Sequence, residues 1–116
     1  MAAPTLSLCI PAYNAADHLP NLLESADRQT VPFDEILVYD DCSTDDTAAV
    51  ACEHGARVLA GEVNLGCTEG RARLAEEAAS EWVHFHDADD VLLPNFVEQA
   101  HQWMTRPDPP DVILFA

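Results

Sequence analysis

The sequence contains no lysine, and its basic residues other than histidine are 5 arginines. Against them stand 21 aspartate and glutamate residues, which give a formal net charge of −16. A surface of this charge repels nucleic acid and anionic lipid, so neither is expected as a partner. It also repels a free nucleotide, so a bound phosphate would need a metal ion or a well-placed arginine beside it.

Several familiar sequence signatures are missing as well. Cys9, Cys42, Cys52 and Cys67 form no Cys-x-x-Cys pair and no zinc-type spacing, which predicts reduced, mostly buried cysteines. No glycine-rich phosphate loop is present, neither Gly-x-x-x-x-Gly-Lys nor Gly-x-Gly-x-x-Gly. The sequence shows no charged-then-apolar leader pattern and no apolar run near the roughly 20 residues that cross a bilayer. We therefore expect a cytoplasmic protein.

Along the sequence, apolar patterns typical of strands alternate with patterns typical of helices. With 116 residues and 48% hydrophobic content, it is long enough for one domain with a core, spanning residues 1–116. Strands are predicted at 5–10, 35–39, 56–60, 82–86 and 111–115, and helices at 14–29, 43–54, 68–79 and 94–104. This alternation predicts an α/β fold, a Rossmann-like three-layer sandwich whose mostly parallel sheet has helices on both faces.

Local signals suggest where these elements begin and end. Pro11 is expected to end the first strand, and Asn14 to cap the first helix. Ser43 and Thr68 are expected to cap the second and third helices. Gly55 suits the left-handed position that closes the second helix.

An acidic cluster follows the predicted strand at residues 82–86. Asp87, Asp89 and Asp90 lie within four residues and have no basic neighbour in sequence. On an extended backbone, Asp87 and Asp89 point to the same side, as hard oxygen ligands for Mg²⁺ or Mn²⁺. The plain alternative is a solvated turn that caps the next helix. A second alternative is a transition-metal site made by Asp89 with His84 and His86.

Two further polar clusters follow predicted strands, Tyr13-Asn14 and Asp40-Asp41. In open parallel sheets, ligands bind beyond the carboxyl ends of the strands, at the point where the strand order reverses. Asp40 and Asp41 are candidates for ligand contact, although capping of the helix at Ser43 would also explain them. The recurrence of polar residues at one edge predicts a binding site.

Three segments resemble the family 2 glycosyltransferases of the GT-A fold. They are residues 8–14, which end in Pro-Ala-Tyr-Asn, residues 35–45 with Asp-Asp-Cys-Ser, and residues 64–90. The last segment contains Asn64, Gly66 and Arg71, and ends in Asp-Ala-Asp-Asp at residues 87–90. The resemblance extends from Leu6 to Phe115.

The resemblance implies a domain that binds a nucleotide-diphosphate sugar, by family habit a UDP-sugar, with Mn²⁺ or Mg²⁺. The implied substrate-binding residues are Pro11, Tyr13, Asn14, Asp40, Asp41, Arg71 and Asp87, and the implied metal-binding residues are Asp87 and Asp89. By analogy, Pro11, Tyr13 and Asp41 line the base pocket. Arg71 lies near the base or the phosphates, or else forms an ion pair with nearby acids. Asp87 faces the ribose, and Asp89 holds the metal.

Two departures from the family pattern stand out. Cys42 replaces the usual glycine after Asp41, where positive φ is more difficult for a cysteine. Family members also carry an acceptor-binding half and a catalytic base after this region. We therefore expect the donor-binding half of a longer enzyme, inactive alone, whose acceptor is a saccharide, lipid or protein. The apolar residues 112–115 would then be uncovered and could pair with a second copy.

Two other classes of function are alternatives. An acidic receiver domain of a signalling system has similar size and binds Mg²⁺, but by resemblance it needs a lysine near its last strand. The chain has none. A non-catalytic module that binds a nucleotide-sugar is the other alternative.

Overall fold

The central sheet has four strands in the part of the chain that the structure describes, residues 3–64 and 66–111 of a computed structural model. They are β1 (Leu6–Ala12), β2 (Glu35–Asp40), β3 (Arg57–Ala60) and β4 (Trp82–Phe85). Their order is β3-β2-β1-β4, and every neighbouring pair is parallel. The strand predicted at 111–115 lies, beyond Asp111, outside the described residues.

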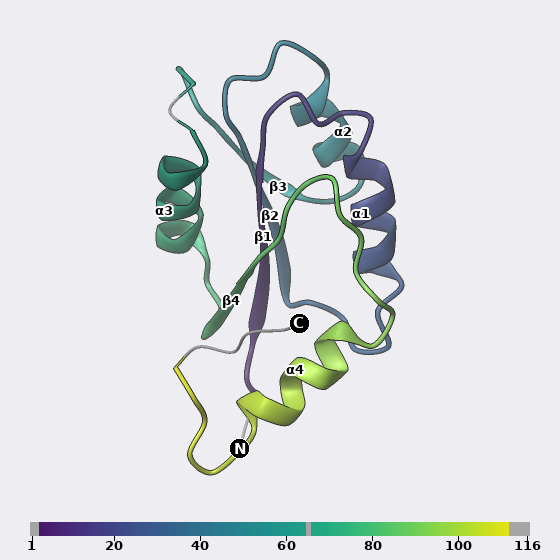
Figure 1. The fold of residues 1–116 in the computed structure, drawn as a ribbon, viewed down its shortest axis with the longest axis vertical. Coiled ribbons are helices and arrows are strands. Elements are labelled where there is room, and N and C mark those ends of the chain that lie inside the picture. Colours follow the sequence, from purple (N-terminus) through teal and green to yellow (C-terminus); the bar gives the residue numbers. More distant parts are fainter. Residues whose placement is uncertain (1–2, 65, 112–116) are drawn as a thin grey trace.

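Four helices cover the sheet on both faces (Figure 1). They are α1 (Leu19–Asp27), α2 (Thr47–Glu53), α3 (Cys67–Glu77) and α4 (Phe96–Met104). Figure 1 shows α3 on one side of the sheet and α1 and α2 on the other. The predicted α/β sandwich with helices on both faces is therefore confirmed. None of the helices in the described ranges is long and apolar enough to cross a membrane.

The core follows from the alternation of side chains along the strands. Leu8 and Ile10 of β1 point to one face, where they pack in a cluster with Leu22 of α1. Cys9, between them in sequence, points to the other face and packs with Leu74 of α3. A third cluster joins the lower end of this sheet to α4 through Leu6 and Val97.

The strand β1 runs through Pro11 instead of ending there. The carbonyl of Cys9 accepts from the His86 N–H on the β4 side, and that of Ala12 accepts from Asp41 on the β2 side. Because backbone groups alternate in direction along a strand, Pro11 faces the β4 side. β4 has already ended at Phe85, so the proline lacks an N–H where no partner strand would use it.

The N-caps predicted for α1, α2 and α3 are wrong, whereas the glycine predicted to end α2 is confirmed. The N-cap positions are His18, Asp46 and Gly66, and none makes a side-chain capping hydrogen bond. At the end of α2, Gly55 has φ +84° and its N–H donates to Cys52 O, while the Ala56 N–H donates to Ala51 O. This is the predicted left-handed glycine closure.

The cysteines also differ from expectation. Cys9 is buried, but Cys42 and Cys52 are exposed. Burial, with a smaller contribution from Glu35, raises the pKa of the Cys9 thiol to about 12, so this cysteine is a packing residue and not a nucleophile.

Candidate functional site

The three polar clusters predicted from the sequence follow strands that end at one edge of the sheet. Because β1, β2 and β4 are parallel, their carboxyl ends share that edge, at the top of Figure 1. The chain leaves β1 toward β2 on one side, and β4 is added later on the other side. The strand order thus reverses at β1, and such sheets bind ligands beyond the carboxyl ends of the strands at this point.

Asp40 and Asp41, at the end of β2, have different surroundings. The Asp40 carboxylate accepts from the Ser43 N–H at 3.0 Å, which closes the turn after the strand. Asp41 is only 6% exposed, and its carboxylate accepts from the Gly66 N–H at 3.0 Å. Asp40 therefore shapes its own loop, whereas Asp41 also fixes the residue from which α3 begins.

The loop after β1 is joined to the loop after β2 by a set of hydrogen bonds that we call the loop clamp. Three consecutive N–H groups donate to side-chain oxygens: Asn14 to Ser43 Oγ at 2.9 Å, Ala15 to Thr47 Oγ1 at 2.9 Å, and Ala16 to Asp45 Oδ2 at 3.2 Å. In return, the Asn14 side-chain oxygen accepts from the Thr44 N–H at 2.8 Å. Asn14, expected to cap a helix, instead joins the loop after β1 to the loop after β2.

Thr47 and Asp45 complete the clamp from the start of α2. The Thr47 side chain is buried, and its hydroxyl donates to the Asp45 carboxylate while accepting from Ala15. Asp45 also accepts from the Thr47 N–H at 3.0 Å. These hydrogen bonds, the one from the Thr47 hydroxyl foremost, lower the pKa of Asp45, so the clamp favours a charged carboxylate.

The acidic segment after β4 is a turn and not an extended strand. The Asp90 N–H donates to the Asp87 carbonyl at 3.2 Å, so the segment turns back on itself. The argument that Asp87 and Asp89 share a side because they lie two apart on an extended backbone is therefore wrong. Both carboxylates are nevertheless exposed, while Ala88 packs against the core.

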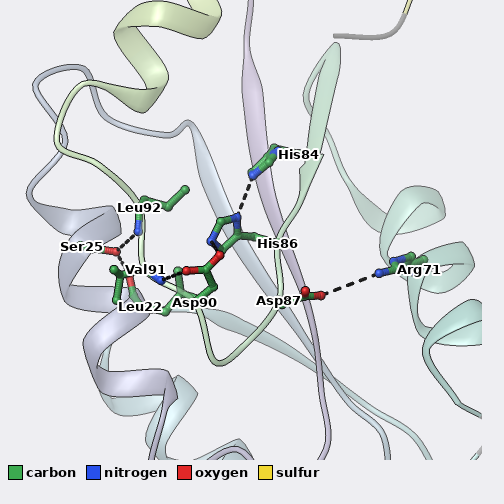
Figure 2. A network of polar contacts seen from close by, with 9 residues as sticks. All are labelled: Leu22, Ser25, Arg71, His84, His86, Asp87, Asp90, Val91 and Leu92. Atoms are coloured by element: carbon green, nitrogen blue, oxygen red, sulfur yellow. Dashed lines mark hydrogen bonds and ion pairs between the residues drawn. The ribbon is translucent and has the colours of Figure 1, made fainter. Parts of the chain in front are cut away.

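Arg71 of α3 approaches this turn from the opposite face of the sheet (Figure 2). Its Nη2 lies 3.9 Å from Asp87 Oδ1, and the Asp87 side chain is 74% exposed. An exposed pair at this distance contributes little to stability. Arg71 thus places a positive charge beside the acidic turn without being held there tightly.

Two histidines precede the acidic turn and lie on the α1 side of the sheet (Figure 2). His84 Nε2 is 3.0 Å from His86 Nδ1, and the His84 ring lies 4.4 Å from the Phe96 ring of α4. Burial, and to a smaller degree His86, lowers the pKa of His84 to about 4 from the ordinary 6.5. We therefore interpret the two histidines as part of the packing between β4 and α4.

The transition-metal alternative fails on this geometry. The carboxylate near His86 is Asp90, whose Oδ2 is 3.9 Å from His86 Nε2. Among the described residues, no group of three His, Cys, Asp or Glu side chains is arranged to hold a metal ion. Exposed aspartate oxygens without further protein ligands suit a hard cation that keeps water and takes other ligands from phosphates.

The loop that follows the acidic turn is anchored to α1. The Leu92 N–H donates to Ser25 Oγ at 3.0 Å (Figure 2). The Gln29 side chain donates to the Leu93 carbonyl at 2.7 Å and accepts from the Val97 N–H at 3.0 Å. Ser25 of α1 and Gln29, which follows α1, therefore anchor the loop between the acidic turn and α4.

The close packing of α3 against the sheet depends on glycines next to Tyr39. An added Cβ at Gly70 would lie 2.9 Å from the Tyr39 ring, and one at Gly61 would lie 2.6 Å from its hydroxyl. The buried face of α3 is made by Gly70 and Leu74, and not by the alanines 72 and 75, which are exposed. Arg71, next to Gly70, consequently points away from the core and toward Asp87.

Asp45 and Thr47 were not singled out from the sequence. Their partners are backbone N–H groups about 30 residues earlier in the chain, which no local pattern shows. The one available signal was Asp-x-Thr at residues 45–47, shortly after the Asp-Asp cluster that follows a strand.

Residues 7–115 match glycosyl transferase family 2. The chain belongs to this family of enzymes. An uncharacterized glycosyltransferase of Haemophilus influenzae is 33% identical over 98 residues, which cover 84% of this chain and 33% of that protein.

Solved structures of glycosyltransferases share the fold of this family 2 domain. S. aureus TarS 1-349 in complex with UDP-GlcNAc superimposes with a TM-score of 0.81 at 30% identity, covering 86% of this chain and 31% of that one. Glucosyl-3-phosphoglycerate synthase from Mycobacterium tuberculosis, in complex with Mn²⁺, UDP and glucosyl-3-phosphoglycerate, gives 0.69 at 28% identity, covering 82% and 37%. The chain spans about a third of the length of these relatives.

Proposed function

We propose that this family 2 domain binds a nucleotide-diphosphate sugar, preferentially a UDP-sugar, at the carboxyl edge of its sheet, and presents the sugar for transfer to an acceptor. The observation that carries the proposal is the placement of Asp41 and Asp87 beyond the ends of β2 and β4, on either side of β1. That is the position where parallel sheets bind nucleotides. Support comes from TarS, which was solved in complex with UDP and with UDP-GlcNAc.

The base is proposed to lie between the loops after β1 and β2. The Tyr13 side chain is 50% exposed despite its size, which leaves a ring face for a base to stack on. Pro11 and Asp41 would line the same pocket, with the Asp41 carboxylate accepting from a ring N–H. Asn14 and Asp40 contribute by holding the two loops, because their side-chain oxygens already accept from Thr44 and Ser43.

The diphosphate is proposed to lie toward the acidic turn, with Asp87 facing the ribose. Asp87 and Asp89 would hold Mn²⁺ or Mg²⁺, because their exposed hard oxygens fit such a cation. When bound, the cation neutralises charge on the departing diphosphate. Arg71, beside Asp87, adds a second positive charge to a strongly negative surface.

Titration calorimetry of UDP, with and without Mn²⁺, tests the proposal. We expect binding that requires the metal and that weakens by about two orders of magnitude in Asp89→Ala, because a carboxylate ligand is removed. Asp27→Ala is the matched control, since Asp27 is also exposed but ends α1, away from the carboxyl edge.

Two results would contradict the proposal. Equal affinity with and without Mn²⁺ would reduce Asp89 to a turn residue. Absence of UDP binding by the folded wild type would refute the assigned donor site as a whole.

A further inference from the structure

The loop clamp joins the two segments that carry Tyr13 and Asp41. Its hydrogen bonds connect residues 29 to 32 positions apart in sequence, and the three donors are consecutive N–H groups. A helix cap alone would need none of them, because the partners lie in the loop that follows β1 and not in α2. The Asp45 carboxylate shows this division, with one oxygen on Thr47 and the other on Ala16.

Two backbone conformations that few residues adopt lie in the loops that the clamp joins. Asn14 has φ 48° and Cys42 has φ 58°, and both follow directly after a residue of the proposed base pocket. Left-handed conformations at residues other than glycine persist where the surrounding structure fixes them. Asn14 is fixed by Ser43 and Thr44, so the direction of the preceding Tyr13 depends on the other loop.

Thr47 is the buried centre of this arrangement. Its hydroxyl both accepts from the Ala15 N–H and donates to Asp45, so that all three polar groups are satisfied by one another. A buried N–H without a partner is unfavourable, and the loop would move to find one. Loss of the Thr47 hydroxyl therefore acts on the loop after β1, two residues from Tyr13.

We propose that Asp45 and Thr47 are positioning residues for the nucleotide base, acting through the loop clamp to hold Tyr13 and Asp41 in fixed relative positions. This role rests on the proposed donor site. It predicts an effect confined to the base side, because the acidic turn with Asp87 and Asp89 lies across β1 and shares none of the clamp's hydrogen bonds. Preorganised contacts of this kind raise affinity because less ordering remains to be done on binding.

The test compares Thr47→Val with Thr47→Ser, which keeps the hydroxyl, and with Val97→Ala. Val97 is buried in the cluster of α4, at the opposite end of the sheet from the clamp (Figure 1). Its truncation lowers stability without touching either loop. UDP affinity is measured by calorimetry at saturating Mn²⁺, the affinity for Mn²⁺ alone by electron paramagnetic resonance, and backbone order at Tyr13 and Asp41 by ¹⁵N relaxation.

We expect Thr47→Val to bind UDP about tenfold more weakly. Its affinity for Mn²⁺ should be unchanged, and the Tyr13 and Asp41 amides should lose order together. Thr47→Ser and Val97→Ala should bind UDP as the wild type does. Asp45→Ala, at an exposed position, is the second variant and should repeat the result if Thr47→Val does not fold.

Three results would overturn the positioning role. They are wild-type UDP affinity in a folded Thr47→Val or Asp45→Ala protein, unchanged order at Tyr13 and Asp41, and an equal loss of affinity in Val97→Ala. Each leaves the proposed donor site standing. A wild-type chain that binds no UDP refutes the donor site, and the positioning role with it.

Discussion

Cys42 occupies a backbone position at which glycine would be unstrained. Its φ of 58° lies in the left-handed region, and its side chain is exposed, with its Sγ 3.5 Å from the Glu62 carbonyl. The left-handed conformation costs a residue with a Cβ roughly 1–2 kcal/mol, part of which glycine returns through its greater freedom in the unfolded chain.

Cys42→Gly should therefore raise the free energy of unfolding by about 0.5–1 kcal/mol. Cys42→Ala is the matched control, because it removes the sulfur but keeps the strain, and it should leave stability nearly unchanged. Urea denaturation monitored by circular dichroism measures both variants. Equal stability of the glycine and alanine variants would show that the backbone at Cys42 is not strained.

Neighbouring residues of one type show what sequence can and cannot assign. That Asp40 and Asp41 lie at the binding edge follows from the strand before them, and this part of the site was predictable. Which of the two closes the turn and which reaches Gly66 depends on loop geometry. Both residues are aspartates next to each other in sequence, so only their positions in the folded structure distinguish them.

The packing of α4 on β4 makes the elements of this region sensitive to pH. The His84 ring lies between β4 and Phe96 of α4, beside His86, and its pKa is lowered to about 4 from 6.5. The folded protein therefore binds fewer protons at His84 than the unfolded chain does between these two values. Stability gained from this packing is complete above pH 6.5 and is lost as the pH falls toward 4.

We expect the free energy of unfolding to fall on acidification through this window with an added slope on the order of 1 kcal/mol per pH unit. His84→Gln removes the titrating group and should remove that slope, whatever its effect on stability at neutral pH. Carboxylates titrate in both proteins, so the difference between the two denaturation series isolates His84. Parallel curves from pH 7 to about 4 would contradict the assignment.

The helices and strands were predictable because their apolar residues repeat with the right period. Leu19, Leu22 and Leu23, which repeat at helical spacing in the sequence, are buried on one face of α1. Helix starts were not predictable, because Asn14 and Ser43 make hydrogen bonds to other loops instead of to the helices that follow them. The buried face of α3 could not be predicted either, because it also depends on a contact with a distant part of the chain. Gly70 lies so close to the Tyr39 ring that a larger residue would not fit there.

The molecule as a whole carries far more negative than positive charge. Its 21 acidic residues outnumber its 5 arginines, of which Arg57 pairs with Glu77 and Arg71 approaches Asp87. The short dimensions of the fold are 26 and 25 Å, so at low ionic strength charges repel one another across the molecule. This repulsion opposes folding.

Adding NaCl from about 0.01 M to about 1 M shortens the Debye length from about 30 Å to about 3 Å and should raise the melting temperature. Differential scanning calorimetry measures the shift. The same titration near pH 4, where more carboxylates are protonated, serves as the control and should show a smaller gain. A melting temperature independent of salt at neutral pH would mean that the surface charge does not weaken the fold.

The parallel direction of the four strands also separates the two ends of the molecule. The end opposite the candidate site is closed by hydrogen bonds around the start of β1, where Leu6 pairs with Asp34 and Thr5 receives the Trp82 and Glu81 N–H groups. A tether joined ahead of Pro4 would leave from that closed end. When the protein is immobilised by such a tether on a sensor surface, the carboxyl edge of the sheet with the candidate site faces the solution.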